Sequence, residues 1–460
     1  MLLNFTVSNF TSFDKAKEFS MEAGRVRGKR EHVAVSRYSR TLKFSAIYGA
    51  NAAGKSNLIK AMNFARNVIV NNGHIPNGYT SSYNRVNADN INVPSTFEFE
   101  ILLGKKRYTY GFSLLLASLT FEKEWLYDST NNSKLLFNRT FDDKSSLNFP
   151  IKGEAEKRIR IYFDDIKYDH ETLFLSEMNR KKNEIYKEVV SIAFLRDVYD
   201  WFSQKLVFIY PEAGDPNRYS FTFSTDKKSL FSKLKLFGLD ITDYKYEQTN
   251  IDNVLGPIPD ELKKNILADI EKSLAKKRRG EIKDEHRAFL FNGKDLYFFG
   301  LDSEDSVVFQ TVKIQHGNLG EYLLSEESDG TRRILELVEV LLSTKDDVTY
   351  VIDEIDRSMH PLLTDAFISE YLSKVEERKI QLIVTTHESR LLNTNRLRRD
   401  EIWFMEKKDG NSDIWRFDQM EDTENTGTLA RGDIRIEAAY LNGRYGGIPN
   451  LITSIDGDKL

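Results

Sequence analysis

The sequence contains no cysteine. Disulfide bonds, zinc–thiolate sites and thiol catalysis are therefore excluded, since each of them needs a cysteine sulfur. The absence leaves the redox compartment undetermined. The sequence also lacks a long hydrophobic run, because its most apolar window, Phe112–Phe121, is interrupted by Ser113, Ser118 and Thr120. That window is too short to span a bilayer.

A signal-peptide pattern and a strong net charge are not found in the sequence either. The segment Met1–Val7 has neither the basic start nor the apolar run of a signal peptide. We therefore expect a cytoplasmic protein with no membrane association. The 66 basic and 70 acidic residues give a net charge of −4, which provides no global attraction to nucleic acid. The 460 residues, 40% of them hydrophobic, are enough for two or three domains with a substantial core.

The most informative segment is Gly49–Ser56, which matches the G-x-x-x-x-G-K-S pattern of a P-loop. Small residues let successive backbone N–H groups turn inward and surround phosphate oxygens. Lys55 would bring a positive charge to the β- and γ-phosphates of ATP, and the Ser56 hydroxyl would bind Mg²⁺. The candidate nucleotide-binding residues here are Gly49, Asn51, Ala52, Ala53, Gly54, Lys55, Ser56 and Asn57.

The flanks of this segment favour a nucleotide site. Leu42–Tyr48 is typical of a strand that enters the loop, and Leu58, Met62, Ala65 and Ile69 recur at helical spacing after it. The phosphates would then lie at a helix N-terminus, where free N–H groups favour anions. The alternative is a chance match in a loop rich in Gly, Ala and Asn. The order of strand, loop and helix favours the P-loop.

A second motif follows the apolar strand Val348–Ile352, which ends in Asp353 and Glu354. This is the pattern of a Walker B strand, in which Asp353 would hold Mg²⁺, directly or through water. Glu354 would orient or deprotonate the attacking water, as phosphoryl transfer requires. The alternative is an acidic strand end in contact with solvent.

Another apolar strand, Gln381–Thr386, ends at His387. Ligands bind at the carboxyl edge of a parallel sheet, so a His at this position could contact the γ-phosphate. A lone His is more often structural, and that alternative remains. The predicted catalytic residues are Lys55, Glu354 and His387.

Ser328–Arg332 begins a helix with Ile334, Leu337 and Leu341 on its apolar face. Ser328 could cap this helix and do no more. It could equally bind a γ-phosphate at the helix N-terminus. The order of motifs along the chain decides between these two interpretations. The order is P-loop, Ser-x-Gly helix start, Asp-Glu, Asp356 and Thr-Thr-His.

That order resembles the ATP-binding-cassette (ABC) class, and within it the head domains of the RecF, Rad50 and structural-maintenance-of-chromosomes (SMC) group. The resemblance implies a P-loop α/β fold. It also implies that Ser328 and Gly330 bind, in trans, the γ-phosphate of ATP held by another subunit. Asp356 would belong to the D-loop.

The residues within these motifs resemble those of stand-alone bacterial ATPases from phage-defence and abortive-infection operons. These are the RloA and AbiL types and, more distantly, the ATPase of the PARIS system. The resembling stretches are Asn9–Phe13, Glu327–Arg332, Asp353–Asp356 with His360-Pro361, and Ala439–Pro449, with Glu171–Ser176 a looser match. Two features depart from the ABC pattern. No glutamine occurs between Ser56 and Gln204, where a Q-loop is expected, and the signature lacks the full Leu-Ser-Gly-Gly-Gln form.

We predict an α/β P-loop NTPase of the ABC-ATPase head type, with an N-terminal β-rich lobe and an inserted, mainly helical arm. The expected domains are residues 1–150 (lobe I, with the P-loop and antiparallel strands), 151–304 (the arm) and 305–460 (lobe II, with the signature, Walker B, D-loop, His switch and tail). Apolar periodicity predicts helices over Leu173–Phe202 and Asp260–Lys277.

Function follows from the motifs and the resemblance together. We expect a Mg²⁺-dependent ATPase that forms a homodimer or a higher even-numbered homo-oligomer and controls a separate effector, for which a nuclease is one candidate. Because few residues follow His387, we expect no nuclease domain of the Toprim type within the chain. One alternative is a DNA-repair ATPase that clamps DNA, and another is a nucleotide-binding scaffold with negligible hydrolysis.

Two basic runs have open interpretations. Arg25–Arg30 could be a loop near the nucleotide or a partner, or simply a solvated loop. Lys276–Arg279, at a helix end, could contact nucleic acid or be only a favourable C-terminal charge cluster.

Overall fold

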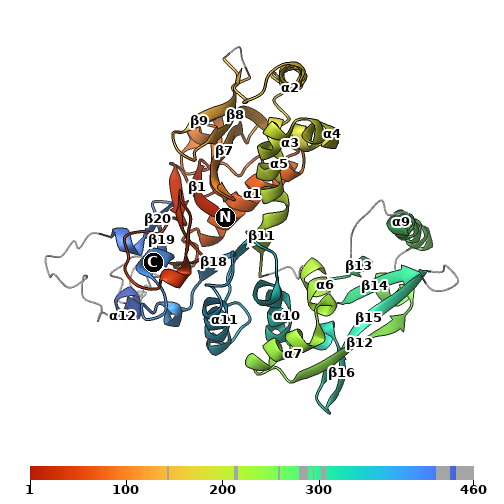
Figure 1. Cartoon of the computed structure of the whole chain (residues 1–460). Coiled ribbons are helices and arrows are strands. Elements are labelled where there is room, and N and C mark those ends of the chain that lie inside the picture. The colour runs from red at the N-terminus through yellow and green to blue at the C-terminus, as the bar shows by residue number, and fades with distance from the viewer. Residues whose placement is uncertain are drawn as a thin grey trace, which may run out of the picture. The chain divides into compact units, whose positions relative to one another are not determined.

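Figure 1 shows the computed structural model of the chain, which describes residues 1–141, 144–211, 216–256, 259–278, 288–293, 295–301, 307–420 and 436–441. The chain divides into two compact units. The first unit contains the described residues of Met1–Ile209, Lys345–Ile355 and Leu372–Leu460, and the second contains those of Tyr210–Thr344 and Asp356–Tyr371. The domain boundaries expected from the sequence stay a prediction.

A six-stranded sheet forms the base of the first unit. Its order is β11 (Leu206–Ile209), β17 (Thr349–Ile352), β18 (Gln381–Thr386), β5 (Phe44–Gly49), β19 (Ile402–Lys408) and β20 (Asn411–Arg416). Neighbouring strands are parallel from β11 to β19, and only β20 is antiparallel. β17, β18 and β5 are buried along their whole length, as expected for parallel strands covered on both faces. The three apolar strands predicted from the sequence are thereby confirmed.

A seven-stranded antiparallel sheet forms the second layer of this unit. Its order is β10 (Ser146–Leu147), β9 (Lys134–Arg139), β8 (Thr120–Asp128), β7 (Lys106–Leu115), β6 (Ser95–Leu103), β1 (Leu2–Ser8) and β2 (Lys17–Ser20). Alternating burial along β6 shows one face turned to the core. The predicted N-terminal β-rich lobe is therefore present.

The helix α1 (Lys55–Val70) contacts both sheets, as Figure 1 shows. Its buried side chains lie on more than one face of the helix, from Leu58 to Ile69. Phe64 stacks against Phe10 and contacts Phe97 of β6, with ring centroids 5.2 Å apart in each pair. A helix that is apolar on several faces needs such enclosure, because exposing either face would leave hydrophobic area in water.

One amide side chain joins the two sheets. The buried Gln381 accepts hydrogen bonds at Oε1 from Leu2 N (2.6 Å) and Thr349 Oγ1 (2.9 Å). Its Nε2 donates to Leu2 O (2.9 Å) and Leu42 O (3.0 Å). A glutamine amide has two donors and two acceptor sites, so every one of them is satisfied. This side chain fixes the start of β18 relative to β1, β17 and the segment before β5.

Short helices cover the seven-stranded sheet: α2 (Glu154–Asp165), α3 (Phe174–Asn179), α4 (Asn183–Glu188) and α5 (Ala193–Asp200). The single helix predicted over Leu173–Phe202 is therefore wrong. Lys181 adopts a left-handed φ of 53°, a conformation that ends helices, and Arg180 is extended. The apolar spacing continues across these breaks because α3 and α5 pack against each other.

A buried carboxylate holds the N-terminus of α3. Glu124 of β8 accepts hydrogen bonds from the Tyr110 hydroxyl (2.9 Å) and from the backbone N–H groups of Phe174 (2.7 Å) and Leu175 (3.0 Å). Its carboxylate lies 3.5 Å from the Arg139 guanidinium, and both side chains are fully buried. Burial raises the pKa of Glu124, while Arg139 and the two N–H groups oppose that rise.

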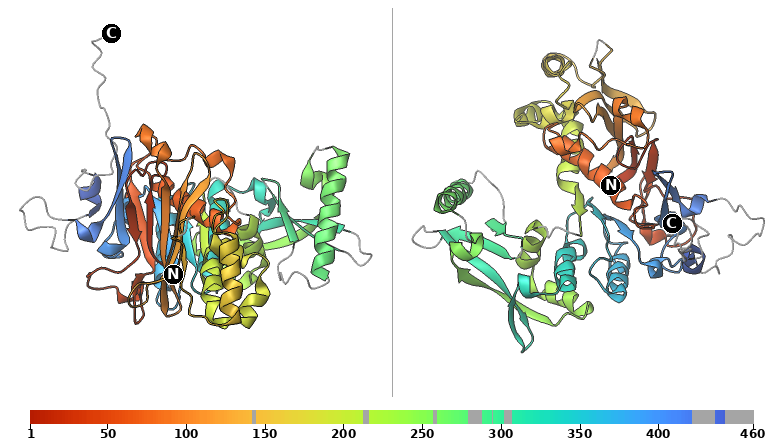
Figure 2. Two further views of the ribbon diagram at one scale, coloured as in Figure 1. Left: turned by 90° about the horizontal axis from the view of Figure 1, so that it is seen from above. Right: turned by 180° about the vertical axis from the view of Figure 1, so that it is seen from behind.

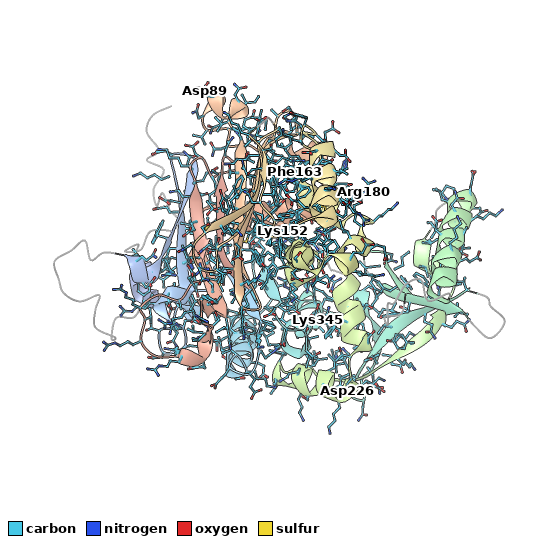
Figure 3. The ribbon with its side chains drawn as sticks, turned by 45° about the horizontal axis from the view of Figure 1, so that its top comes forward. Asp89, Lys152, Phe163, Arg180, Asp226 and Lys345 are labelled. Carbon is cyan, nitrogen blue, oxygen red and sulfur yellow. The ribbon has the colours of Figure 1, made fainter. Side chains whose placement is uncertain are left out.

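The helices that follow reach the end of α1. Ser176 Oγ donates to Ile69 O (2.7 Å) and Tyr199 OH donates to Val70 O (3.2 Å), so both satisfy carbonyls at the helix C-terminus. Phe163 of α2, labelled in Figure 3, packs edge-on against Phe174 with centroids 5.1 Å apart. Because Glu124 of β8 holds the N-terminus of α3 and Ser176 of α3 contacts Ile69, α3 connects the antiparallel sheet to α1.

Replacing Glu124 by Ala should lower the free energy of unfolding by about 3–5 kcal/mol, because Arg139 would remain buried without its partner. Denaturant unfolding followed by circular dichroism measures this change. The control is Glu154→Ala, since the Glu154 side chain is 90% exposed and its ion pair with Lys157 lies on the surface. Equal stability of the two variants would contradict the role assigned to Glu124.

The second unit is built on a five-stranded antiparallel sheet of β12 (Ile241–Thr249), β15 (Val307–His316), β14 (Leu296–Leu301) and β13 (Ala288–Phe291), with β16 (Gly320–Leu323) paired to β15. On one face, α9 (Asp260–Arg278) contributes Ile270 to a cluster with Tyr297 and Phe309. Figure 2 shows α9 against this sheet. On the other face, α6 (Pro216–Ser224) accepts hydrogen bonds at Phe223 O from Tyr244 and Tyr246.

The rest of this unit contains α7 (Lys227–Leu236), α8 (Ile251–Leu255), α10 (Asp329–Leu342) and most of α11 (Pro361–Ser373). Residues 151–304 thus contain strands β11–β14 as well as helices. The helix predicted over Asp260–Lys277 is confirmed as α9. The side chains of Lys276–Arg278, all of Arg279 and the stretch 442–449 lie outside the described residues. Across the described part of the chain, no helix is long and apolar enough to cross a membrane.

Candidate nucleotide-binding site

The P-loop lies between β5 and α1, in the order that the sequence predicts. Gly49 is the last residue of β5, and α1 begins at Lys55. Ala52 and Gly54 have positive φ values of 63° and 109°. A Cβ at Gly54 would overlap the Ser412 hydroxyl, and one at Gly49 would lie 2.5 Å from Met405 O. Both positions therefore need glycine, because the chain passes too close to its neighbours for a side chain.

A small polar cluster supports the loop from β20. The Ser412 hydroxyl lies 2.7 Å from Ala53 O and 2.7 Å from the Ser12 hydroxyl. Asn57 Nδ2 donates to Ser12 Oγ at 2.8 Å. Asn57 and the Asn9–Phe13 stretch thus hold the P-loop in shape. Sequence reasoning missed Ser412, which follows no recognisable motif and reaches the loop only through strand pairing.

Lys55 lies at the mouth of the loop. Its Nζ donates to Gly49 O (2.7 Å) and Ala50 O (3.1 Å) and lies 3.5 Å from His387 Nδ1. No side chain caps the N-terminus of α1. The first N–H groups of this helix therefore remain available, and together with the dipole and the ammonium group they favour an anion.

The two acids follow β17 and are positioned by a hydroxyl from the adjacent strand. Thr385 Oγ1 donates to Asp353 Oδ1 at 2.6 Å and accepts from the backbone N–H of Glu354 at 2.8 Å. Ser56 Oγ donates to the same Asp353 oxygen at 3.2 Å. Thr385 therefore fixes both acidic residues relative to the P-loop. The Thr-Thr pair before His387 is visible in the sequence, but the sequence did not predict the contacts of Thr385 with the two acids.

These groups surround one cavity of about 460 Å³, a size suited to a small-molecule ligand. Its lining residues are Asn51, Ala52, Ala53, Gly54, Lys55, Ser56, Asn57, Glu354, His387 and Lys407. Gly49 and Asp353 lie behind this lining, in contact with Lys55 and Ser56. Lys407 of β19 adds a cation that the sequence motifs did not indicate.

Ser56 and Asp353 supply a hydroxyl and a carboxylate oxygen, the ligand types that Mg²⁺ prefers. Among the described residues, no group of three His, Asp or Glu side chains could hold a metal ion. Mg²⁺ is commonly bound by one or two protein ligands together with substrate phosphates. The pair of side chains therefore fits such an ion.

The remaining predicted site residues, Ser328, Gly330 and Asp356, lie in the second unit. Ser328 caps α10, because its Oγ accepts from Thr331 N at 3.1 Å. A Cβ at Gly330 would lie 2.9 Å from Ser358 O, so close packing requires glycine there. Both residues thus have a local structural role, which the sequence had left as one of two interpretations.

The parallel sheet, the P-loop and the acids that follow strand β17 together define an ATPase of the P-loop class. Residues 44–203 and 219–393 match the family described as "AAA domain, putative AbiEii toxin, Type IV TA system". The chain belongs to this family. No curated protein matches the chain.

Several solved structures are similar to the chain. One is the "SmcHead bound to the C-winged helix domain of ScpA", with 11% identity and a TM-score of 0.42 over 90% of this chain and 97% of that one. Another is the SMC head domain from Thermotoga maritima, with 12% identity and a TM-score of 0.36 over 90% and 98%. A third is the Smc head domain with an extended coiled coil bound to the C-terminal domain of ScpA derived from Pyrococcus furiosus, with 14% identity and a TM-score of 0.38 over 90% and 95%.

Replacing Thr385 by Val should reduce ATP turnover about 10–100-fold, the usual effect of removing a group that orients a metal ligand. The substitution keeps the branched shape but removes the hydroxyl that contacts Asp353 and Glu354. Nucleotide binding measured without Mg²⁺ should be unchanged, whereas Thr385→Ser should keep most of the activity. Steady-state ATPase assays and fluorescent-nucleotide titration check this, and full turnover in a folded Thr385→Val protein would contradict it.

Proposed function

We propose that the protein is an ATP-binding and ATP-hydrolysing switch that requires Mg²⁺. The observation that supports this most directly is the meeting of Lys55, Glu354 and His387 at one cavity, with Asp353 behind it. Phosphoryl transfer needs positioning and charge stabilisation rather than protein covalent chemistry. A cation, a helix N-terminus and two fixed acids supply both requirements.

Each residue has a definite role in this proposal. Lys55 and the N–H groups of α1 bind the β- and γ-phosphates. Ser56 and Asp353 would hold Mg²⁺, which would neutralise charge on the phosphate oxygens. Glu354 orients the attacking water and accepts its proton, and His387 donates a hydrogen bond to the γ-phosphate.

The switch acts through assembly. Ser328 and Gly330 of one subunit contact the γ-phosphate held by another, and Asp356 lies in the D-loop beside them. ATP would thereby close a homodimer, or a higher even-numbered homo-oligomer, that controls a separate effector in the bacterial cytoplasm; a nuclease is one candidate. The family description refers to an AbiEii toxin and Type IV TA systems, which supports a role in anti-phage defence.

Glu354→Gln should keep ATP binding and lower turnover by about 10²–10⁴, the usual contribution of a positioned general base. Gln has almost the same shape as Glu but cannot accept the proton from water. A phosphate-release assay measures turnover, and titration with a fluorescent ATP analogue measures affinity. Unchanged turnover would remove Glu354 from the mechanism.

Lys55→Ala provides the contrasting variant. This substitution removes the cation that contacts the phosphates. It should therefore weaken the affinity for ATP, whereas Glu354→Gln should lower turnover and keep ATP binding. If Lys55→Ala bound ATP as tightly as the unaltered protein, the cavity would not be the nucleotide site.

A pair of substitutions separates the capping role of Ser328 from its proposed role in trans. Asp and Asn cap helices about as well as Ser, so α10 should remain intact in both variants. In a Glu354→Gln background with ATP, Ser328→Asn should retain the dimer, whereas the added carboxylate of Ser328→Asp should repel the γ-phosphate and leave monomers. Light scattering reports the mass. Dimers in both variants, or a monomer in the parent protein, would count against the composite site.

A further inference from the structure

The basic run Arg25–Arg30 lines a cavity of about 490 Å³ in the first unit, together with the hairpin of β3 (Val33–Val35) and β4 (Arg40–Leu42). The lining residues are Arg25, Val26, Arg27, Gly28, Arg30, Val33, Val35, Arg40 and Arg398. We call this cavity the arginine basin. No lining residue is acidic and none is aromatic. Its charge is therefore strongly positive, in contrast to the chain as a whole.

Arg398 fixes the floor of the basin. Its guanidinium donates to Gly28 O (2.6 Å) and Val26 O (3.4 Å) and forms an ion pair with Asp400 (2.7 Å). Both charged side chains are almost completely buried. Asp400 also accepts from Gly24 N at 2.8 Å. Arg398 thus holds the backbone of the loop, and its charge is balanced.

Two further contacts attach the loop at its far end. Lys29 Nζ donates to Thr394 O at 2.7 Å, and His32 Nδ1 lies 2.8 Å from a Glu401 carboxylate oxygen. Burial raises the pKa of Glu401, while the hydrogen bond from His32 opposes that rise. The loop is therefore held along its length by the segment from Thr394 to Glu401, although its own sequence is polar and contains glycine.

The other four guanidinium groups differ from Arg398. Arg25, Arg27, Arg30 and Arg40 are exposed, and within the described ranges none of them forms an ion pair. Like charges around one basin repel one another, and water screens this repulsion only partly. The fold thus holds an unbalanced cationic surface on a fixed loop, and an anion would relieve the repulsion.

We propose that the arginine basin binds the phosphate backbone of duplex nucleic acid. Guanidinium groups match phosphate oxygens in a bidentate geometry. A duplex carries closely spaced phosphates on a stiff scaffold, so several arginines are engaged at once without the ordering cost of a flexible acidic peptide. The basin has no aromatic side chain on which unpaired bases could stack, which favours a duplex over a single strand.

This inference goes beyond the proposed ATPase function. No residue of the basin lines the nucleotide cavity, so the two proposals can fail separately. Contacts to phosphates carry no base sequence information, and the binding is therefore expected to be sequence-independent.

The test uses the full chain and a short fluorescent duplex of random sequence, with binding followed by anisotropy over a range of salt concentrations. The variant combines Arg25→Gln, Arg27→Gln, Arg30→Gln and Arg40→Gln. Its duplex affinity should fall at least about tenfold at low salt. The slope of log K against log salt should become shallower by about 3–4, since each lost phosphate contact removes about 0.9. Basal ATP turnover and thermal unfolding should not change.

A matched variant removes the same number of charges elsewhere in the first unit: Arg85→Gln, Lys105→Gln, Lys134→Gln and Arg180→Gln. These side chains are exposed and do not line the basin, and Arg180 is labelled in Figure 3. If binding depends on the basin, this variant should keep affinity and salt slope close to those of the unaltered protein. Equal losses in both variants would show a net-charge effect and overturn the proposal.

Competitors identify the kind of anion. Unlabelled duplex should displace the probe more effectively than single-stranded DNA or polyglutamate. The proposal is overturned if the unaltered protein does not bind the duplex at low salt, if single strands compete better, or if the basin variant loses polyglutamate binding and retains the duplex.

Discussion

The parallel pairing of β18 with β17 and β5 is the constraint on which the nucleotide site depends. Strands that run in the same direction end at the same edge of a sheet, so the residues that follow them meet there. Thr386 pairs with Tyr48 and Ile352 pairs with Val384, which brings Gly49, Asp353 and His387 together from distant parts of the sequence. The fully satisfied amide of Gln381 fixes the start of the central strand, because any shift of register would break four buried hydrogen bonds.

Neutral hydroxyl groups do most of the positioning at this edge. Thr385 contacts both acidic residues, and Ser412 contacts the backbone of the P-loop. A neutral hydroxyl can orient a carboxylate without adding a charge that would compete with Mg²⁺ or phosphate for it. Lys55, Glu354 and His387 line the cavity, whereas Thr385, whose hydroxyl accepts from the Glu354 backbone N–H, is not part of its lining.

Sequence analysis predicted the features that depend on local patterns. The P-loop, the acids after β17 and the buried strands follow from residue types in short segments, and the helix at Ser328 follows from apolar spacing. It did not predict Ser412, Lys407 or Gln381, because these side chains reach their partners only through long-range strand pairing. The prediction of one helix over 173–202 was wrong for a related reason. The apolar spacing there arises from packing against α1 and the sheet, whereas the backbone breaks twice between the short helices. The basic run Arg25–Arg30 was visible, but its attachment to Arg398 and Asp400 was not.

The strand β19 relates the two candidate sites of the first unit. It begins directly after Glu401, which contacts His32 beside the arginine basin, and its Lys407 lines the nucleotide cavity. In between, Met405 pairs with Gly49, whose missing side chain lets the two strands approach. A strand that is hydrogen-bonded on both sides is stiff. A ligand that displaces one end of it therefore strains the contacts that the other end makes. Any resulting coupling between the sites must be reciprocal, since it is a difference in binding free energy shared by both ligands. One strand of the central sheet therefore runs from beside the arginine basin to the nucleotide cavity.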